Sequence, residues 1–479
     1  MSFDPVSFAM GKAAGGGGGG GTHIDPEADV RFFDSYDGSV VASYSAEDFA
    51  NLTELPANPT HEGLTSQGWN WTLADAKAQV AFGGFLDIGQ MYITDDDCTR
   101  VYVKIVANRS PIIRPYLSGT NASVTIDWGD GSTPDTYTGS NTYKEATHTY
   151  AADGNYVVSI KVNSGKLQIE GNSSDYGSFI FTANVNYVTY NRKYLNDVYR
   201  IEIGKDVILY NRALSRLARL EGVTIPRGCT ITGTYVFYDS CLKHLTIPDD
   251  ITTIPGYFLQ NDATLESISI PKSITTIKTY PFRYCGMLER VCVPNGVTTV
   301  NGNLFTDTSG IKRLTIPNTL STIPTYYAGS PILLRYLEIP ENVTQIGSTA
   351  FAGSAAVEKI KLPAGLTTIG ASGLANFYGM REINLPSTLT TIGNNGLDGC
   401  NSLPRIEIPA SVTSIGNAAF KNSGFGEIKF LGSTPPTVGS NAFQNLPTGC
   451  KILVPAGSLS AYTGTTNMPS SSTYTYEEY

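Results

Sequence analysis

Prolines recur at a fixed interval through the second half of this 479-residue chain. One interval of 22 residues is followed by seven of 23, and these prolines stand at positions 226, 248, 271, 294, 317, 340, 363, 386 and 409. Pro455 lies two further periods on, and Gly204 and Gly432 occupy other positions of the series. A period of this length is the signature of a solenoid in which each turn is one supersecondary unit. We therefore predict about eleven stacked turns over residues 201–456.

Apolar residues occupy fixed positions around each proline. The residues three and one before it are aliphatic and alternate with polar ones, which predicts a short strand with one buried face. Further apolar residues stand three and six after the proline, and a Phe or Leu usually stands eleven after, as at Phe282 and Leu374. Burial of about five side chains per turn, at roughly 1.5–3 kcal/mol each, does not offset the ordering of a turn at about 1–2 kcal/mol per residue. Stability must therefore come from stacking between turns.

The recurring text of these turns resembles the BspA-like leucine-rich-repeat family. Examples are LEIPENVTQIGSTAFAGS, which begins at Leu337, and IEIPASVTSIGNAAFKNS, which begins at Ile406. The resemblance extends over more than half of the chain. It implies a binding scaffold that bacteria, some parasites and their phages use for attachment to surfaces, and it carries over no catalytic residues.

The outward strand positions beside the prolines vary in sequence, and we interpret them as the candidate ligand-binding surface. They hold Arg290, Arg313, Tyr336, Glu338, Lys359, Lys361, Glu382 and Arg405. A solvated charged face explains any single one of these residues equally well, and that alternative stays open.

Residues 100–200 are predicted to form a β-sandwich. The text VTIDWGDGSTPD, followed by THTYAADGNYVVSIKV, is similar to the polycystic-kidney-disease-type (PKD) immunoglobulin-like domain, whose usual role is that of a spacer or adhesion module. Asp127 and Asp130 have the side chains of calcium ligands, but the segment from Asp127 to Gly131 is also a good turn, and we favour turn chemistry over a metal site.

Residues 22–99 read as a small α/β module. A hairpin is expected about Asp37 and Gly38, and helices are expected to begin after the capping residues Ser45 and Thr72. Trp69, Trp71 and His61 are interpreted as packing under a loop, with a ligand shelf as the alternative.

The first 21 residues combine a short apolar helix with the glycine run Gly15–Gly21. Pro5 suits the first helical position, and seven glycines make a flexible tether. We predict that this segment anchors the chain to a partner through Phe3, Val6, Phe8 and Met10. A frayed terminus is the alternative. Residues 457–479 are expected to form a C-terminal tail.

Composition narrows the classes of function. A net charge of −9 and a pI near 5.1 disfavour a protein that binds nucleic acid or anionic membrane. No stretch approaches 18 apolar residues and no secretory signal is recognised at the N-terminus, so we expect no membrane insertion and synthesis in the cytoplasm. The four histidines lack metal-ligand or triad surroundings, and the seven cysteines form no C-x-x-C pair. We predict no cofactor, no metal and no enzymatic activity.

The functional hypothesis is a phage virion protein, a fibre or decoration. Its N-terminus would contact other virion proteins, and its repeats would bind a host cell-surface glycan or protein. The alternative is a bacterial leucine-rich-repeat adhesin or interaction protein outside any virion. Homo-oligomerisation is left open, because no coiled-coil heptad supports it.

Overall fold

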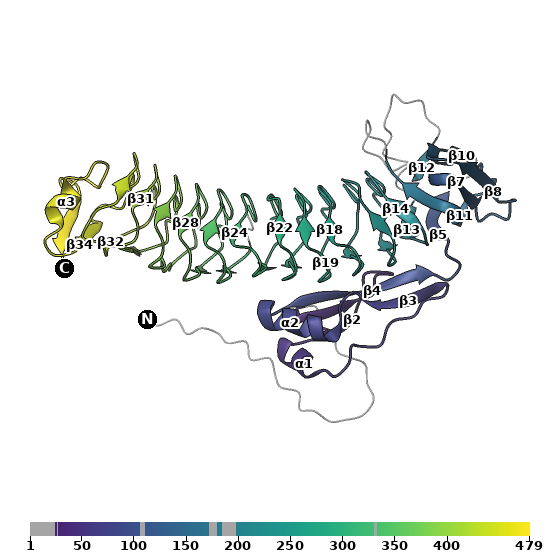
Figure 1. Cartoon of the computed structure of the whole chain (residues 1–479), viewed down its shortest axis with the longest axis horizontal. Coiled ribbons are helices and arrows are strands. Elements are labelled where there is room, and N and C mark those ends of the chain that lie inside the picture. The colour runs from purple at the N-terminus through teal and green to yellow at the C-terminus, as the bar shows by residue number, and fades with distance from the viewer. Residues whose placement is uncertain (1–23, 26, 106–110, 172–179, 184–197, 330–332) are drawn as a thin grey trace.

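The computed structural model describes residues 24–25, 27–105, 111–171, 180–183, 198–329 and 333–479. These residues form a mainly β molecule in which a long solenoid follows two smaller N-terminal units (Figure 1). Among them, no helix is long and apolar enough to cross a membrane. The predicted fold class is confirmed, with a solenoid of about 12 turns of roughly 23 residues over positions 200–478.

The first unit, which we call the N-terminal module, is a four-stranded sheet with two helices. Its sheet order is β2-β1-β4-β3, with β1 and β4 parallel. Ser45 and Thr72 accept the capping hydrogen bonds from Asp48 and Asp75 as predicted, because a side-chain oxygen satisfies an amide that the first helical turn leaves open. The elements are β1 (Val30–Phe33), β2 (Val40–Tyr44), α1 (Ala46–Asn51), β3 (Leu64–Trp69), α2 (Leu73–Gly83) and β4 (Leu86–Thr94).

The second unit is a sandwich of two sheets. Trp128 and Tyr150 are fully buried in its core, and the Tyr150 hydroxyl donates to the Trp128 carbonyl at 2.8 Å. One sheet holds β5 (Thr99–Ile105), β7 (Tyr116–Asp127), β8 (Asp135–Gly139), β9 (Thr142–Tyr143) and β11 (Gly154–Ile169). The other holds β6 (Pro111–Ile113), β10 (Ala146–Thr147) and β12 (Ile180–Ala183).

The sandwich and the solenoid share one continuous sheet. β13 (Val198–Glu202) pairs antiparallel with β5 and parallel with β15 (Gly222–Thr224). β11 pairs parallel with β14 (Val207–Leu209), which in turn pairs with β16 (Thr230–Ile231). The first turn of a solenoid would otherwise expose unpaired backbone groups, so the sandwich caps that end.

Two series of short parallel strands run along the solenoid. In both series equivalent residues are about one period apart, as in the pairs Leu337 with Ile360 and Ile346 with Ile369. The first series, with the predicted outward positions, is β17 (His244–Thr246), β19 (Ser267–Ser269), β21 (Arg290–Cys292), β23 (Arg313–Thr315), β25 (Tyr336–Glu338), β27 (Lys359–Lys361), β30 (Arg405–Ile408), β32 (Glu427–Phe430) and β34 (Lys451–Val454). The second is β18 (Thr253–Ile254), β20 (Thr276–Ile277), β22 (Thr299–Val300), β24 (Thr322–Ile323), β26 (Gln345–Ile346), β28 (Thr368–Ile369), β29 (Thr391–Ile392), β31 (Ser414–Ile415) and β33 (Thr437–Val438).

The predicted core positions are buried. Ile277, Phe282 and Leu374 are 0% exposed, and the side chains of Cys285 and Cys400 are buried beside them in the same core. The interior is thus filled from both strand series and from the turn that follows the second series.

The C-terminal segment differs from the expectation of a tail. It contains α3 (Leu459–Thr463) and β35 (Thr475–Glu478), and β35 pairs parallel with β34 in four residue pairs. The last turn therefore lacks the repeat text but continues the strand series. A solenoid end needs such an atypical turn, because the exposed strand would otherwise lie unpaired.

The N-terminal module packs across the first strand series (Figure 1). Its strand β4 lies against β15, β17, β19 and β21. Asn70 Nδ2 donates to the Ile247 carbonyl at 2.9 Å, and Trp71 Nε1 donates to the Ile270 carbonyl at 3.1 Å. Gly89 lies so close to Thr246 that a Cβ atom there would overlap its side chain. Docking therefore depends on the absence of a side chain at position 89, where the Thr246 side chain packs.

Candidate ligand-binding surface

The outward positions of the first strand series fall into two regions. We call the outward residues of β15, β17, β19, β21 and β23 the covered face, because the N-terminal module lies on them. We call those of β25, β27, β30, β32 and β34, together with Glu382, the open face. The eight predicted ligand-binding residues are divided between these regions.

Two predicted residues lie on the covered face. The predicted outward exposure is wrong for Arg290, which the N-terminal module buries, whereas Arg313 is only partly covered and keeps 37% of its side chain exposed. Arg290 is 6% exposed, pairs with Asp87 at 3.3 Å and donates to the carbonyls of Ala28 and Asp29. Burial lowers the pKa of Arg290 to about 10, which leaves it charged at neutral pH. Arg313 donates to Asp29 at 3.0 Å, and its guanidinium lies 4.5 Å from the centre of the Phe85 ring. Both arginines hold the N-terminal module.

The other six predicted residues are exposed on the open face, where each strand alternates outward and buried side chains as expected. Oppositely charged neighbours pair along it: Lys361 bonds Glu338 at 2.7 Å, and Lys429 lies 3.7 Å from Glu407. Exposed pairs of this kind contribute little to stability. The exposed residues are Tyr336, Glu338, Lys359, Lys361, Glu382 and Arg405.

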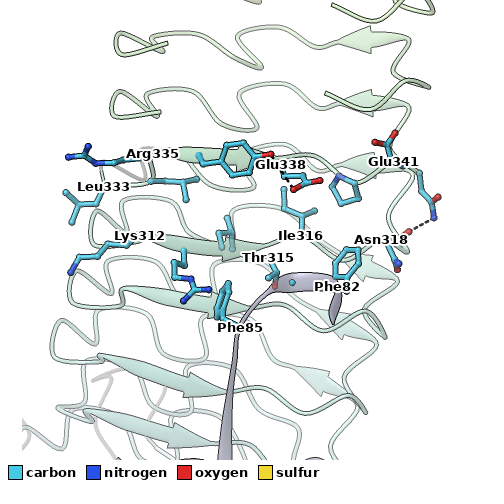
Figure 2. A pocket seen from close by; sticks show the side chains of 17 residues that line it. Phe82, Phe85, Lys312, Thr315, Ile316, Asn318, Leu333, Arg335, Glu338 and Glu341 are labelled. Carbon is cyan, nitrogen blue, oxygen red and sulfur yellow. Dashed lines mark hydrogen bonds between the residues drawn. The ribbon is translucent and has the colours of Figure 1, made fainter. Parts of the chain in front are cut away.

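A groove of about 780 Å³ lies where the N-terminal module ends and the open face begins (Figure 2). One wall is the end of α2, with Phe82 and the adjacent Phe85; the other is formed by β23, β25 and the residues around them. Three apolar side chains in it are exposed to solvent: Phe82 by 40%, Leu333 by 46% and Tyr336 by 47%. These three define what we call the apolar rim of the groove.

Charged side chains of both signs border the groove. Lys312 and Arg335 lie toward one end, and Glu338 and Glu341 lie toward the other (Figure 2). Arg313 also lines the groove. The Lys361 ammonium is 2.7 Å from Glu338 and 3.7 Å from Glu341, and its bond to Glu338 raises the pKa of Lys361. Chemically, the groove offers apolar contact, hydrogen-bond donors and paired charges.

The remaining sequence candidates have structural roles in the described residues. Asp127 and Asp130 accept backbone hydrogen bonds from Gly129 and Ser132, as turn chemistry predicts. Trp69 packs against Phe32. Within the described ranges, no group of three or more His, Cys, Asp or Glu side chains gathers as a metal site would require. The predicted anchoring residues Phe3, Val6, Phe8 and Met10 lie outside the described residues.

His61 is also held by its neighbours. Its Nε2 lies 2.7 Å from an Asp34 carboxylate oxygen, and its ring stacks on Tyr36 with 3.9 Å between centroids. Packing under a loop, the interpretation favoured from the sequence, agrees with this arrangement.

The sequence interpretation missed the groove residues Phe82 and Leu333 and the covering of the first turns. A signal for the second was present. Small side chains fill the last position of the covered strands, whereas charged side chains fill it in β25 and β27. The small residues are Thr224, Thr246, Ser269, Cys292 and Thr315.

Comparison with known proteins identifies the repeats. The family model described as the BspA-type leucine-rich repeat region matches residues 208–330 and 327–449, with six copies. No curated protein matches.

Among solved structures, a leucine-rich repeat protein of Bacteroides ovatus is 20% identical, with a TM-score of 0.45, and the match covers 67% of this chain and 95% of that one. The pneumococcal vaccine antigen PcpA is 15% identical, with a TM-score of 0.43 and coverage of 66% and 94%. A leucine-rich cell surface protein of Faecalibacterium prausnitzii is 17% identical, with a TM-score of 0.32 and coverage of 67% and 90%. Since the family model spans just over half of the sequence, the chain belongs to the BspA-type leucine-rich repeat family.

Proposed function

We propose that this chain is a non-catalytic binding protein that holds a protein partner in the groove and along the open face. The observation that carries the proposal is the apolar rim of the groove. Large apolar side chains that remain exposed within a charged border are typical of protein interaction sites, because association removes them from water. Tyr336, at the junction of groove and open face, belongs to a residue type enriched among binding hot spots.

The chemistry of the groove supports binding rather than catalysis. Glu338 and Glu341 both lie near the Lys361 ammonium, so this pair of carboxylates is arranged about a cation. A glycosidase would instead place two carboxylates on either side of a scissile bond. One wall of the groove is built on strands that are paired with their neighbours in the solenoid, so its outward side chains stand on a regular frame.

The proposal is tested by binding of the full chain to immobilised bacterial cell-surface proteins, before and after protease treatment of that surface. Phe82→Ser and Tyr336→Ser should each weaken binding at least tenfold, because each removes an apolar anchor. Tyr378→Ser is the matched control: Tyr378 is also 47% exposed but does not line the groove. Unchanged binding by both groove variants, or binding that survives protease treatment, would contradict the proposal.

The biological setting is a separate proposal. The virion hypothesis depends on an anchoring segment that lies outside the described residues, whereas membership of the BspA-type family supports a surface-binding repeat protein in either setting. We therefore favour the bacterial adhesin or interaction protein over the fibre or decoration. Recovery of the chain with cells or their surface material is expected, and stoichiometric recovery in purified phage particles would reverse this choice.

The PKD-type resemblance of the sandwich remains our proposal for its origin. Its pairing with β13 and β14 supports a role as spacer and end cap, in which the sandwich carries the solenoid instead of binding the ligand itself.

A further inference from the structure

The turn after the second strand series contains a left-handed residue at a repeated position. In six of the later turns φ at this position is 52° to 57°, and short or polar side chains occupy it: Asn303, Thr349, Ser372, Asn395, Ala418 and Asn441. Asparagine is common there because its side chain tolerates the left-handed region.

Three consecutive early turns place tyrosine at this position. Tyr235, Tyr257 and Tyr280 have φ of 59°, 59° and 56°. A bulky side chain is strained in this backbone conformation. Such outliers persist where other contacts or a function compensate for the strain. The turn itself does not require tyrosine, since asparagine serves in the same position of the later turns.

The three rings form a continuous column, which we call the tyrosine stack. Tyr235 and Tyr257 are parallel within 5° at 4.3 Å between centroids, and Tyr257 and Tyr280 are within 22° at 5.5 Å. Guanidinium groups close both ends: Arg212 lies 4.7 Å from the Tyr235 centroid, and Arg283 lies 5.1 Å from that of Tyr280. Arginine side chains therefore contact both the first and the last ring of the column.

The stack offers its ring edges to solvent. The three rings are partly exposed, while neighbouring rings and guanidinium groups lie over their faces. The edge of an aromatic ring carries the positive part of its quadrupole, and each hydroxyl can donate. Tyr284, 43% exposed, extends this surface, and its hydroxyl accepts from Arg283 at 2.8 Å. Asp307 fixes Arg283 at 3.0 Å. A row of donors of this kind suits an anion with many acceptor oxygens.

We propose that the tyrosine stack binds an acidic polysaccharide that lies along the solenoid axis. The ring spacings of 4.3 and 5.5 Å are near the length of one sugar unit. In an extended peptide, side chains on one face recur every two residues, about 6.6 Å apart. Single-stranded nucleic acid stacks its bases on open ring faces, whereas here neighbouring rings and guanidinium groups lie over the ring faces. This site is separate from the groove, so it goes beyond the proposed function.

The competing explanation is that the tyrosine stack only stabilises the turns. Substitution of the tyrosines by asparagine distinguishes this explanation from ligand binding. The triple variant Tyr235→Asn, Tyr257→Asn, Tyr280→Asn installs the residue that later turns already use. We expect it to bind oligogalacturonate and heparin fragments at least tenfold more weakly than the full wild-type chain, with an unchanged or higher Tm. Tyr326→Asn is the control, because Tyr326 has the same left-handed conformation two turns beyond the stack.

Oligogalacturonate supplies carboxylates and heparin fragments add sulfates, so the two probes identify the anionic group; wild-type binding to either one supports the proposal. Equal binding to neutral dextran, wild-type affinity in the triple variant, no binding to either acidic probe, or a fall in Tm that accounts for the lost affinity would each overturn it.

Discussion

The covered and open faces are built on the same strand series, yet they present different side chains. On the covered face Thr246, Ser269 and Cys292 are nearly inaccessible, since the N-terminal module packs on them. On the open face Glu338 and Lys361 occupy equivalent positions and are exposed. The inward-facing residues and the register between turns follow one rule in both regions. The repeated positions thus determine the stacked strands and their core. The outward residues determine whether the N-terminal module or solvent lies against a strand.

The largest expected effect comes from removing the tryptophan that joins module and solenoid. Trp71 is 4% exposed and donates to the Ile270 carbonyl. Trp71→Ala should lower the free energy of opening of the N-terminal module by about 3–5 kcal/mol, because a large cavity and an unpaired carbonyl are left. Hydrogen exchange in α2 and β4 measures this.

Tyr336→Ala on the open face is its control and should stay within about 0.5 kcal/mol, as surface changes usually do. Equal hydrogen-exchange rates in the two variants would contradict the inference that covered-face residues stabilise docking and open-face residues do not.

A smaller effect is expected for the buried arginine. Arg290→Ala should destabilise docking by about 2–3 kcal/mol, because charge-assisted bonds to Ala28 and Asp29 are lost in a buried site. Asp87 keeps Arg31 at 2.7 Å, which limits the loss. Arg405→Ala, an open-face arginine, should leave stability unchanged; a comparable loss there would show that exposure does not separate the two positions. Urea denaturation followed by proteolysis of the module measures both variants.

The strands and buried positions of the repeats were predictable from the sequence, because every turn must bury apolar side chains at the same positions. The aliphatic positions around each proline recur, so that Ile277 and Phe282 are recognised by comparison with their neighbours one period away. The helix caps at Ser45 and Thr72 were predictable for a similar reason, since capping depends on residues within one helical turn.

The groove and the covering of Arg290 were not predicted, because both depend on contacts between distant segments. Arg290 reaches Ala28, 262 positions away in the chain, and Phe82 meets the solenoid only through docking of α2. Likewise β35 has no repeat text and joins the sheet through backbone hydrogen bonds, which any sequence can supply. A repeat pattern therefore predicts the positions that recur in every turn. It does not predict contacts that occur only once, such as the docking of the N-terminal module.

Acid should weaken the covered face selectively. Burial lowers the pKa of His244 from 6.5 to about 3, while Asp87 and Arg31 act on it in opposite directions. Below about pH 6.5 His244 therefore binds a proton in the unfolded chain but stays neutral in the docked state. The stability of the docked state is lost as the pH falls from about 6.5 toward 3. Between pH 7 and 5 this amounts to about 2 kcal/mol.

The control for this effect is His244→Gln, which cannot titrate. The difference between wild type and variant in hydrogen exchange of β4 should shrink toward low pH as the wild type loses stability. A constant difference would show that His244 is not buried in its neutral form.

The smallest effect is expected for an exposed ion pair on the open face. Lys361 bonds Glu338 at 2.7 Å, but both side chains are about half exposed, 51% and 52%. Water and salt screen such a pair, and ordering two flexible side chains costs about as much as the attraction gives. Lys361→Ala should therefore leave Tm unchanged within error at physiological ionic strength. If the partner binds across the open face, the same variant should still weaken that binding, because the complex desolvates the charges that solvent now screens. A fall in Tm without a change in binding would reverse the assignment and make the open face a structural surface.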